Sequence, residues 1–465
     1  MKSNNKGGIT LFTILSLVLV MSCLLTLLEG ARVYELHRMA FIRSQGALES
    51  AFAKYNTCLW ENYHLLGNSI DGAKNIIENS AKAGGNTAVL GTNLLRLNPQ
   101  SVEIEEYTLL TDGEGKAYIN AVSGYMKKNI LYETAKAIFN QYEAIKNLVE
   151  KNAPGGTEIS DALDSLKELE KETRGGTDEN PLEYIERIQK TQLLELVIED
   201  TKVLSTLEYD LSESVSQREL KTGKNSSYEE IQWLDQVFLQ QYFMTYLSDF
   251  IHPAKDRGLS YELEYLLGGK NNDIENLREV VNQLFLIREA ANIAYLFSDV
   301  EKMELAHSLA LALAGATANV AVIKVVQLGI IVAWAFGESV LDIRALLQGK
   351  KIPLIKNRES WTLGLENLDQ FSESYMCAQE VDNGISYKTY LGVLLLFQKE
   401  NVLAQRGMDI QEVTLQKSPG AVLLDRLMVK GRVKIVYEYK PVFYDITEKL
   451  GNFCEIIIVA DYGYY

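Results

Sequence analysis

The sequence predicts an α+β protein that is predominantly α-helical, with an N-terminal transmembrane helix, a helical head and strands at the C-terminus. The first observation behind this prediction is an uncharged apolar run over Ile9–Leu28. The second is a spacing of apolar residues at intervals of three and four, typical of helices, which is strong over 274–347. The third is an alternation of apolar and polar residues over 433–440, typical of a half-buried strand. With 465 residues, the chain is long enough for two or three domains.

The uncharged run is long enough to cross a bilayer. Its 20 residues extend about 30 Å as a helix, which matches the thickness of a hydrocarbon core. A cleaved secretory signal is the alternative, but it needs a shorter apolar region and a small-residue cleavage site. Because this run ends in Leu27-Leu28-Glu29-Gly30-Ala31-Arg32, a retained anchor is favoured. The basic residues on its two sides are nearly balanced, so the short tail decides the orientation. We expect a single-pass protein of the cell membrane, with its N-terminus inside and its bulk extracytoplasmic.

The rest of the chain divides by pattern. Helical spacing continues past the anchor at Leu48, Ala51, Phe52, Tyr55 and Leu59. The predicted organisation is a cytoplasmic tail (1–8), the transmembrane helix (9–28), a juxtamembrane helical stalk (29–98), a β-hairpin plus helix (99–149), an acidic helical subdomain (150–260), a helical core (261–425) and C-terminal β-strands (426–465).

The hairpin prediction rests on a turn signal between two apolar stretches. The turn is Asp112-Gly113-Glu114-Gly115, and the residues that flank it are Val102, Ile104 and Tyr107 before it and Tyr118, Ile119 and Val122 after it. Asp112 and Glu114 are also the residue types that bind Ca²⁺. No EF-hand-like loop with a terminal Glu follows them, so a plain turn is favoured.

The acidic subdomain takes its name from residues 150–210, which hold 16 acidic and 7 basic residues. Leucines at helical spacing lie between glycine-containing loop signals in this stretch. A solvated helical surface is the favoured interpretation, and a cation-collecting surface is the alternative.

Residues 309–336 raise a second membrane question, because Lys324 is their only charged residue. A lysine at the centre of a spanning helix costs about 2.5–3.5 kcal/mol on the insertion scale. Seven alanines between Ala306 and Ala321 favour close contact between helices instead. We expect a buried pair of core helices, and a two-pass membrane protein is the alternative.

Two carboxylates follow this stretch at a spacing that places them on one helix face. They are Glu338 and Asp342, four residues apart and shortly after Trp334. We expect a buried polar cluster in which they meet Lys324 or Arg344. Acid pairs elsewhere arise by chance among 62 carboxylates, so a glycosidase-like site is disfavoured.

Composition and motifs exclude several function classes. A net charge of −16 argues against nucleic acid as a partner. The four histidines have no metal-ligand spacing, and phosphate-binding, dinucleotide-binding, hydrolase-elbow and zinc-protease motifs are all missing from the sequence. Four cysteines, one of them in the apolar run, allow at most one disulfide outside the membrane, and free thiols are favoured. We therefore expect no enzyme activity, no catalytic residues, no cofactor and no metal.

The N-terminal stretch Lys6-Gly7-Gly8-Ile9-Thr10-Leu11-Phe12, the apolar run and Leu28-Glu29-Gly30-Ala31-Arg32 resemble the N-termini of pseudopilin-like proteins of tight-adherence (Tad/Flp) pilus systems. The chain is similar to an uncharacterised family from Gram-positive, clostridia-type bacteria that is often encoded beside such pilus genes. Segments with this resemblance are Glu262–Gly269, Trp334–Ser339 with Asp342, Leu347–Pro353, Tyr387–Leu391 and Arg406–Asp409.

The resemblance implies a candidate processing site at Gly7, Gly8 and Ile9, where a prepilin peptidase would cut. Such a peptidase usually finds a glutamate at the fifth mature position, but Thr13 or Phe12 stands there. The expected function is therefore a non-enzymatic minor subunit or accessory factor of a tight-adherence-type pilus or secretion system. Its expected partners are the membrane and other subunits of that system. A membrane-anchored extracytoplasmic enzyme or ligand-binding receptor is the alternative.

Overall fold

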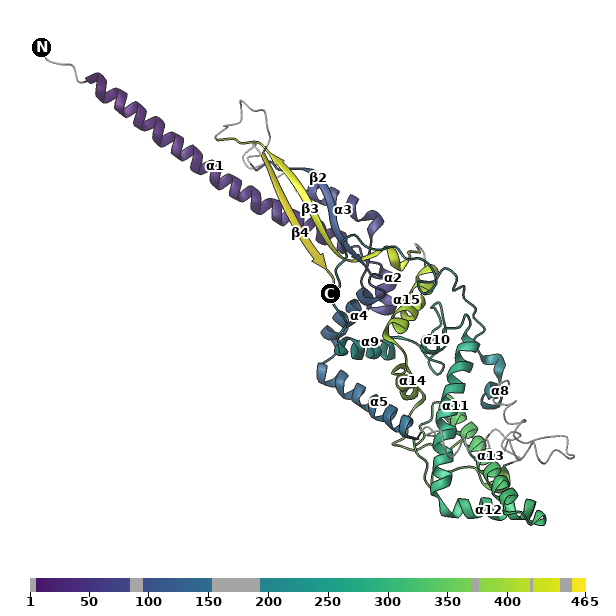
Figure 1. Cartoon of the computed structure of the whole chain (residues 1–465). Helices are drawn as coiled ribbons and strands as arrows, with labels where there is room; N and C mark the ends of the chain where they lie inside the picture. Colours follow the sequence, from purple (N-terminus) through teal and green to yellow (C-terminus); the bar gives the residue numbers. More distant parts are fainter. Residues whose placement is uncertain (1–5, 84–94, 153–192, 369–375, 419–420, 444–453) are drawn as a thin grey trace. The chain divides into compact units, whose positions relative to one another are not determined.

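The computed structural model describes residues 6–83, 95–152, 193–368, 376–418, 421–443 and 454–465 (Figure 1). The chain divides into two compact units. Unit 1 comprises Met1–Tyr125, Glu219–Glu230 and Gly420–Tyr465, and unit 2 comprises Met126–Arg218 and Ile231–Pro419. A long apolar N-terminal helix, a helical body and a small antiparallel sheet confirm the predicted α+β, predominantly α class.

Unit 1 begins with the long helix α1 (Lys6–Phe52), which has 47 residues. Asn56 starts the next helix, because its side chain accepts a hydrogen bond from the backbone N–H of Leu59 at 2.9 Å. The other elements are α2 (Thr57–Tyr63), β1 (Asn68–Ser69), α3 (Ile70–Ala83), β2 (Asn98–Leu109), α4 (Lys116–Asn129), which ends in unit 2, the 3-10 turn η4 (Leu424–Arg426), β3 (Leu427–Tyr439) and β4 (Cys454–Gly463).

The sheet of unit 1 is antiparallel and centres on β3. Val433 pairs with Ile104 of β2 and with Ala460 of β4, so β3 lies between these two strands. β1 pairs with the first two residues of β3. Along β3, Val433, Ile435 and Tyr437 are buried and the residues between them are partly exposed, as the alternating sequence predicts.

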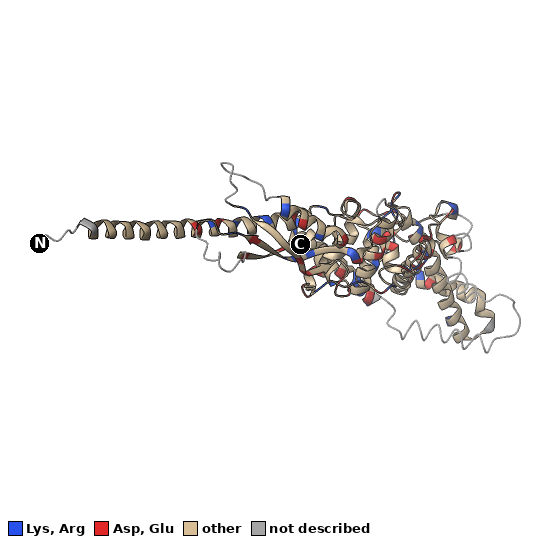
Figure 2. Cartoon of the chain, turned by 90° about the horizontal axis from the view of Figure 1, so that it is seen from above, with Lys and Arg blue, Asp and Glu red and all other residues tan. Residues whose placement is uncertain are grey.

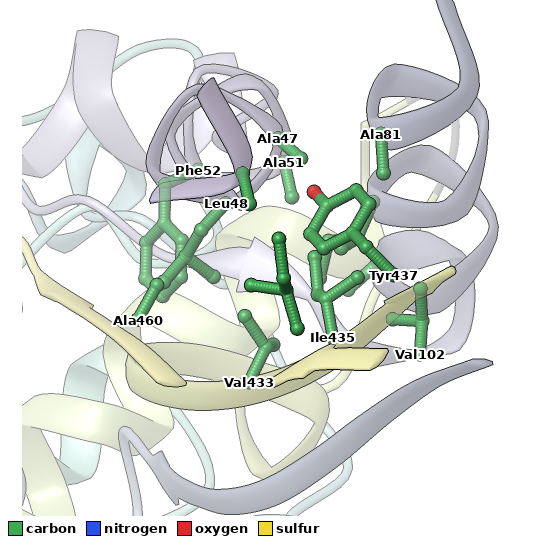
Figure 3. Close-up of a cluster of buried hydrophobic side chains, with 14 of the residues drawn as sticks. Ala47, Leu48, Ala51, Phe52, Ala81, Val102, Val433, Ile435, Tyr437 and Ala460 are labelled. Atoms are coloured by element: carbon green, nitrogen blue, oxygen red, sulfur yellow. The ribbon is translucent and has the colours of Figure 1, made fainter. Parts of the chain in front are cut away.

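The second half of α1 covers one face of this sheet (Figure 3). Leu36, Ala40, Ala47, Leu48 and Ala51 are buried there, together with Phe52 and with Ala73, Ile77 and Ala81 of α3. Several of these residues are alanines, which let the helix backbones approach the strands closely. The buried hydroxyl of Tyr437 lies 3.1 Å from Ser44 Oγ, so a hydrogen bond satisfies both groups. Apolar residues spaced three and four apart along α1 thus form one side of the core of unit 1.

The second strand predicted over Tyr118–Val122 is helix α4 instead. The turn itself forms, since Gly113, Glu114 and Gly115 all have positive φ (68°, 57° and 95°). Asp112 closes it by accepting hydrogen bonds from the N–H groups of Leu109 and Gly223, at 2.8 and 3.0 Å. After the turn, Tyr118, Val122 and Met126 are buried at intervals of four, which fits a helix. The strand partner of β2 is the distant β3.

Unit 2 is helical in its described part. Its elements are α5 (Tyr132–Asn152), α8 (Leu193–Val197), η1 (Thr201–Val203), α9 (Trp233–Tyr246), α10 (Glu262–Gly268), α11 (Asp273–Ser298), α12 (Val300–Ala314), η2 (Gly315–Thr317), α13 (Val320–Leu347), η3 (Leu365–Asn367), α14 (Tyr387–Leu395) and α15 (Glu400–Gln416). Of the predicted acidic subdomain, residues 153–192 lie outside the described ranges, including Leu163, Leu166 and Leu169. Its described remainder contains α8, η1 and α9.

The stretch 309–336 forms parts of two helices rather than one. α12 and α13 meet at a break over residues 315–319, and Ala310, Ala314 and Ile323 pack between them. Every residue from Trp334 to Leu347 is buried, whereas Val320 near the start of α13 is 79 % exposed. The predicted helix pair is present, and its burial is complete only in the second half of α13.

Candidate functional site

Glu338 and Asp342, around which the sequence predicted a buried polar cluster, lie in the core of unit 2. α13 places these carboxylates one turn apart, and both are fully buried. Lys356 Nζ lies 2.5 Å from Glu338 Oε1 and 2.7 Å from Asp342 Oδ1. Arg288 of α11 donates to Asp342 Oδ2 from Nε at 3.0 Å and from its terminal nitrogen at 2.8 Å. Two cations and two carboxylates thus form one network, which we call the buried ion cluster.

Neutral groups complete the buried ion cluster. The backbone N–H groups of Thr362 and Leu363 donate to Glu338 at 3.0 and 2.7 Å, and Asn292 donates to Asp342 Oδ2 at 3.1 Å. The Arg288 guanidinium also donates to the carbonyls of Pro353 and Leu354. All four charged side chains are 0–3 % exposed, so each charge is compensated by protein and not by water.

The electrostatics differ between the two carboxylates. Burial raises the pKa of Glu338, although Lys356 opposes this shift. Burial acts on Asp342 in the same direction, but Arg288 and Lys356 together hold the pKa of this carboxyl below its ordinary value. The two cations favour an ionised Asp342 at the centre of the cluster.

Two of the four predicted members lie elsewhere. Lys324 is exposed, and 14 residues of helix, or about 21 Å, separate it from Glu338. Arg344 is buried, but its guanidinium donates to the carbonyls of Leu196 and Met376 at 2.8 and 3.0 Å. Two residues past Asp342, it faces a different side of α13. The cations that the carboxylates meet are Arg288 and Lys356, which sequence reasoning missed.

A second buried carboxylate outside the ion cluster belongs to Glu264, in the first turn of α10. Glu264 is fully buried, and its Oε1 accepts hydrogen bonds from Tyr387 OH at 2.6 Å and from the N–H of Phe250 at 2.9 Å. Its Oε2 has no hydrogen-bond partner among the described residues. Burial raises the pKa of Glu264 to about 7, and the nearby Asp249 adds to this shift. Unlike Asp342, Glu264 thus has an environment that favours its neutral form.

The candidate processing residues Gly7, Gly8 and Ile9 lie in the first turn of α1. The residues that follow are highly exposed, with Phe12 and Leu27 each 70 % exposed. Figure 2 shows this half of α1 without acidic or basic residues. The hydroxyls of Thr13 and Thr26 donate to carbonyls of the preceding turn at 2.9 and 2.8 Å, so these polar groups are satisfied within the helix.

Two described helices are long and apolar enough to cross a membrane. The first is Gly8–Phe52 of α1, whose most apolar window has none of its residues buried. The second is α13, with 28 % of its window buried. Length and composition alone are weak evidence, because core helices and signal sequences have the same properties. The exposed window of α1 makes it the better candidate for an anchor.

Within the described ranges, no group of three or more His, Cys, Asp or Glu side chains is placed to hold a metal ion. The four cysteines, Cys23, Cys58, Cys377 and Cys454, are free thiols.

The fold and the site define a class: a predominantly helical α+β chain with an apolar N-terminal helix, a small sheet and a closed internal ion cluster. Residues 171–439 match the family of unknown function DUF5702, and the chain belongs to this family. No curated protein and no solved structure matches the chain. The whole buried ion cluster lies within the matched residues.

Proposed function

We propose that the chain is a non-enzymatic, membrane-anchored extracytoplasmic protein that serves as a minor pseudopilin-like subunit or accessory factor of a tight-adherence-type pilus or secretion system. One observation carries the proposal: α1 is a single continuous helix with two different halves. Its first half is exposed, uncharged and as long as a bilayer is thick, and its second half packs on an antiparallel sheet. This arrangement resembles that of pilins, in which the helix anchors the subunit and joins it to its neighbours, and the resemblance supports the proposal.

The two halves of α1 meet at a fixed point. Glu29 and Arg32 form an ion pair at 2.6 Å in the first turn after Leu28, and Glu29 also accepts a hydrogen bond from the N–H of Phe443 at 3.0 Å. The segment that follows β3 is thereby held against α1 where the apolar run stops. In the proposed arrangement the sheet stands directly on the membrane surface, with the short tail inside the cell.

The buried ion cluster fits a structural part of the fold rather than a catalytic site. Its four charged groups are paired with one another and shielded from solvent, whereas a catalytic group must reach its substrate. The cluster fits a part that fixes the packing of α11, α13 and the loop after α13.

Photo-cross-linking in native membranes tests the proposed assembly. A photoreactive residue at Leu19, which is 67 % exposed in the apolar half of α1, should cross-link to membrane-embedded subunits of the same apparatus. A matched probe at Leu286 of unit 2, 64 % exposed, should give none of these products. Mass spectrometry identifies the products.

Two results would contradict this proposal. Lipid adducts alone at Leu19 would indicate an isolated anchor without neighbouring subunits. Cross-links that identify only unrelated membrane proteins would remove the link to pili. The intact mass reports separately on the candidate processing site. We expect no loss of the first seven or eight residues from the 52.3 kDa of this sequence, because neither Phe12 nor Thr13 supplies the usual acid.

A further inference from the structure

An open pocket of about 360 Å³ lies in unit 1 where α1 meets the end of β3. It is lined by residues of α1, of β2 and the segment before it, and of β3 and the segment after it: Arg32, Arg96, Asn98, Glu438, Tyr439, Lys440 and Val442. Arg32 is four residues beyond Leu28, or about 6 Å further along the helix. If the apolar run fills the hydrocarbon core, the pocket is at the height of the lipid headgroups, which add about 5–8 Å on each side.

The side chain of Arg32, which forms one wall of the pocket, is held in place by several contacts. The side chain is 5 % exposed, and its guanidinium pairs with Glu29 at 2.6 Å. It also donates to the carbonyl of Lys440 at 2.9 Å and lies 5.8 Å from the centre of the Tyr439 ring. A cation held by a carboxylate, a carbonyl and an aromatic face does not need to reorganise when a ligand arrives.

The charge of the pocket is opposite to that of the chain. Three cationic residues and one carboxylate line it, in a protein whose net charge is −16. Glu29 offsets the charge of Arg32, and Glu438 is the one carboxylate of the lining, where it accepts a hydrogen bond from the neutral amide of Gln100. Arg96 is exposed and has no ion-pair partner among the described residues. Among the residues named here, three cations thus face two carboxylates, Glu438 and Glu29, and the side-chain amide of Asn98 lies beside them.

We propose that this pocket binds the phosphate group of an anionic phospholipid at the membrane surface. The proposal rests on the anchoring of α1 proposed above and adds a partner to it. Arginine and lysine recognise phosphate oxygens by charge and hydrogen bonding, and each basic residue near an anionic surface strengthens binding by about fivefold. Lipid binding here fixes the sheet upright on the bilayer, because the pocket joins α1 to β3.

Lipid retention by the full-length protein tests the proposal. The protein is purified in detergent micelles that contain phosphatidylglycerol or phosphatidylcholine, and bound lipid is counted by native mass spectrometry. The unaltered chain should retain phosphatidylglycerol in preference to phosphatidylcholine. The double variant R96Q/K440Q should retain it about 25-fold more weakly, since two charges are lost. Arg32 stays unchanged, so the packing of α1 is preserved.

The control is K54Q/K82Q, which removes two exposed positive charges from the same unit outside the pocket. It should retain phosphatidylglycerol as the unaltered chain does. Equal retention by R96Q/K440Q and the control would overturn the proposal. Displacement of the lipid by millimolar inorganic phosphate would also overturn it, because the site would then bind free phosphate.

Alkaline extraction of membranes separates this proposal from the anchor. Both variants should stay in the membrane fraction, since α1 is intact. Release of the unaltered chain by alkali would overturn the anchor itself, whereas a retained chain with no lipid preference would overturn only the pocket.

Discussion

Replacing Asp342 by asparagine is expected to lower the free energy of unfolding of unit 2 by about 3–5 kcal/mol. Asparagine keeps the volume of the side chain but removes its charge. Arg288 and Lys356 are 0 % and 3 % exposed, and Glu338 would then be the one carboxylate left in the cluster for both cations. In the described structure, Glu338 pairs with Lys356, whereas the ion pair of Arg288 is with Asp342. An uncompensated buried charge is among the most costly changes that a single substitution makes.

Tryptophan fluorescence during urea unfolding of the full-length protein measures this effect. Trp334 and Trp361 both donate their ring N–H to the carbonyl of Leu363, at 2.8 and 2.7 Å. The N–H of the same Leu363 donates to Glu338, so the two rings report on the surroundings of the buried ion cluster.

The matched control for Asp342→Asn is Glu301→Gln. Glu301 pairs with Arg358, but the two side chains are 59 % and 74 % exposed, so the loss should stay below about 1 kcal/mol. Similar losses in the two variants would contradict the assignment of the cluster as a desolvated ion network.

The sequence predicted those elements whose structure depends on neighbouring residues in the chain. The exposed half of α1 follows from its uncharged apolar run, and the buried face of β3 follows from the alternation of apolar and polar residues along the strand. The prediction of a strand at Tyr118–Val122 was wrong, because the turn at Gly113 can be followed by a strand or by a helix. The strand that pairs with β2 comes from more than 300 residues further along the chain, and no local pattern indicates it.

Of the buried ion cluster, the sequence predicted the two carboxylates but not the two cations. A spacing of four places Glu338 and Asp342 together on any helix. Their partners depend on tertiary packing: Arg288 comes from another helix, and Lys356 comes from the irregular segment after α13. Arg288 and Asn292 share a face of α11, but this helix also carries several other charged and polar residues, so the sequence did not single out these two. No pattern in the sequence pointed to Lys356 either.

The pH dependence of stability is the second large expected effect, and Glu264 is its main source. Burial raises the pKa of Glu264 to about 7 in the folded chain, whereas an unfolded glutamate titrates near 4.5. Between these values the folded state binds a proton that the unfolded state has lost. The free energy of unfolding should therefore fall as the pH rises from 4.5 to 7, by about 3 kcal/mol from this group. Glu289, whose pKa burial also raises to about 7, acts in the same direction.

Substitution of Glu264 by glutamine isolates this contribution. Glutamine retains an oxygen that accepts from Tyr387 and Phe250 but cannot ionise, so the negative charge near Asp249 never forms. Urea midpoints measured between pH 5 and 8 should fall less steeply with pH in Glu264→Gln than in the unaltered chain, and the variant should be the more stable of the two at pH 8. Glu359→Gln removes a carboxylate from an exposed position and should leave the profile unchanged. A profile for Glu264→Gln as steep as that of the unaltered chain would mean that Glu264 is ionised in the folded protein, and that its buried surroundings stabilise the charge by contacts other than those with Tyr387 and Phe250.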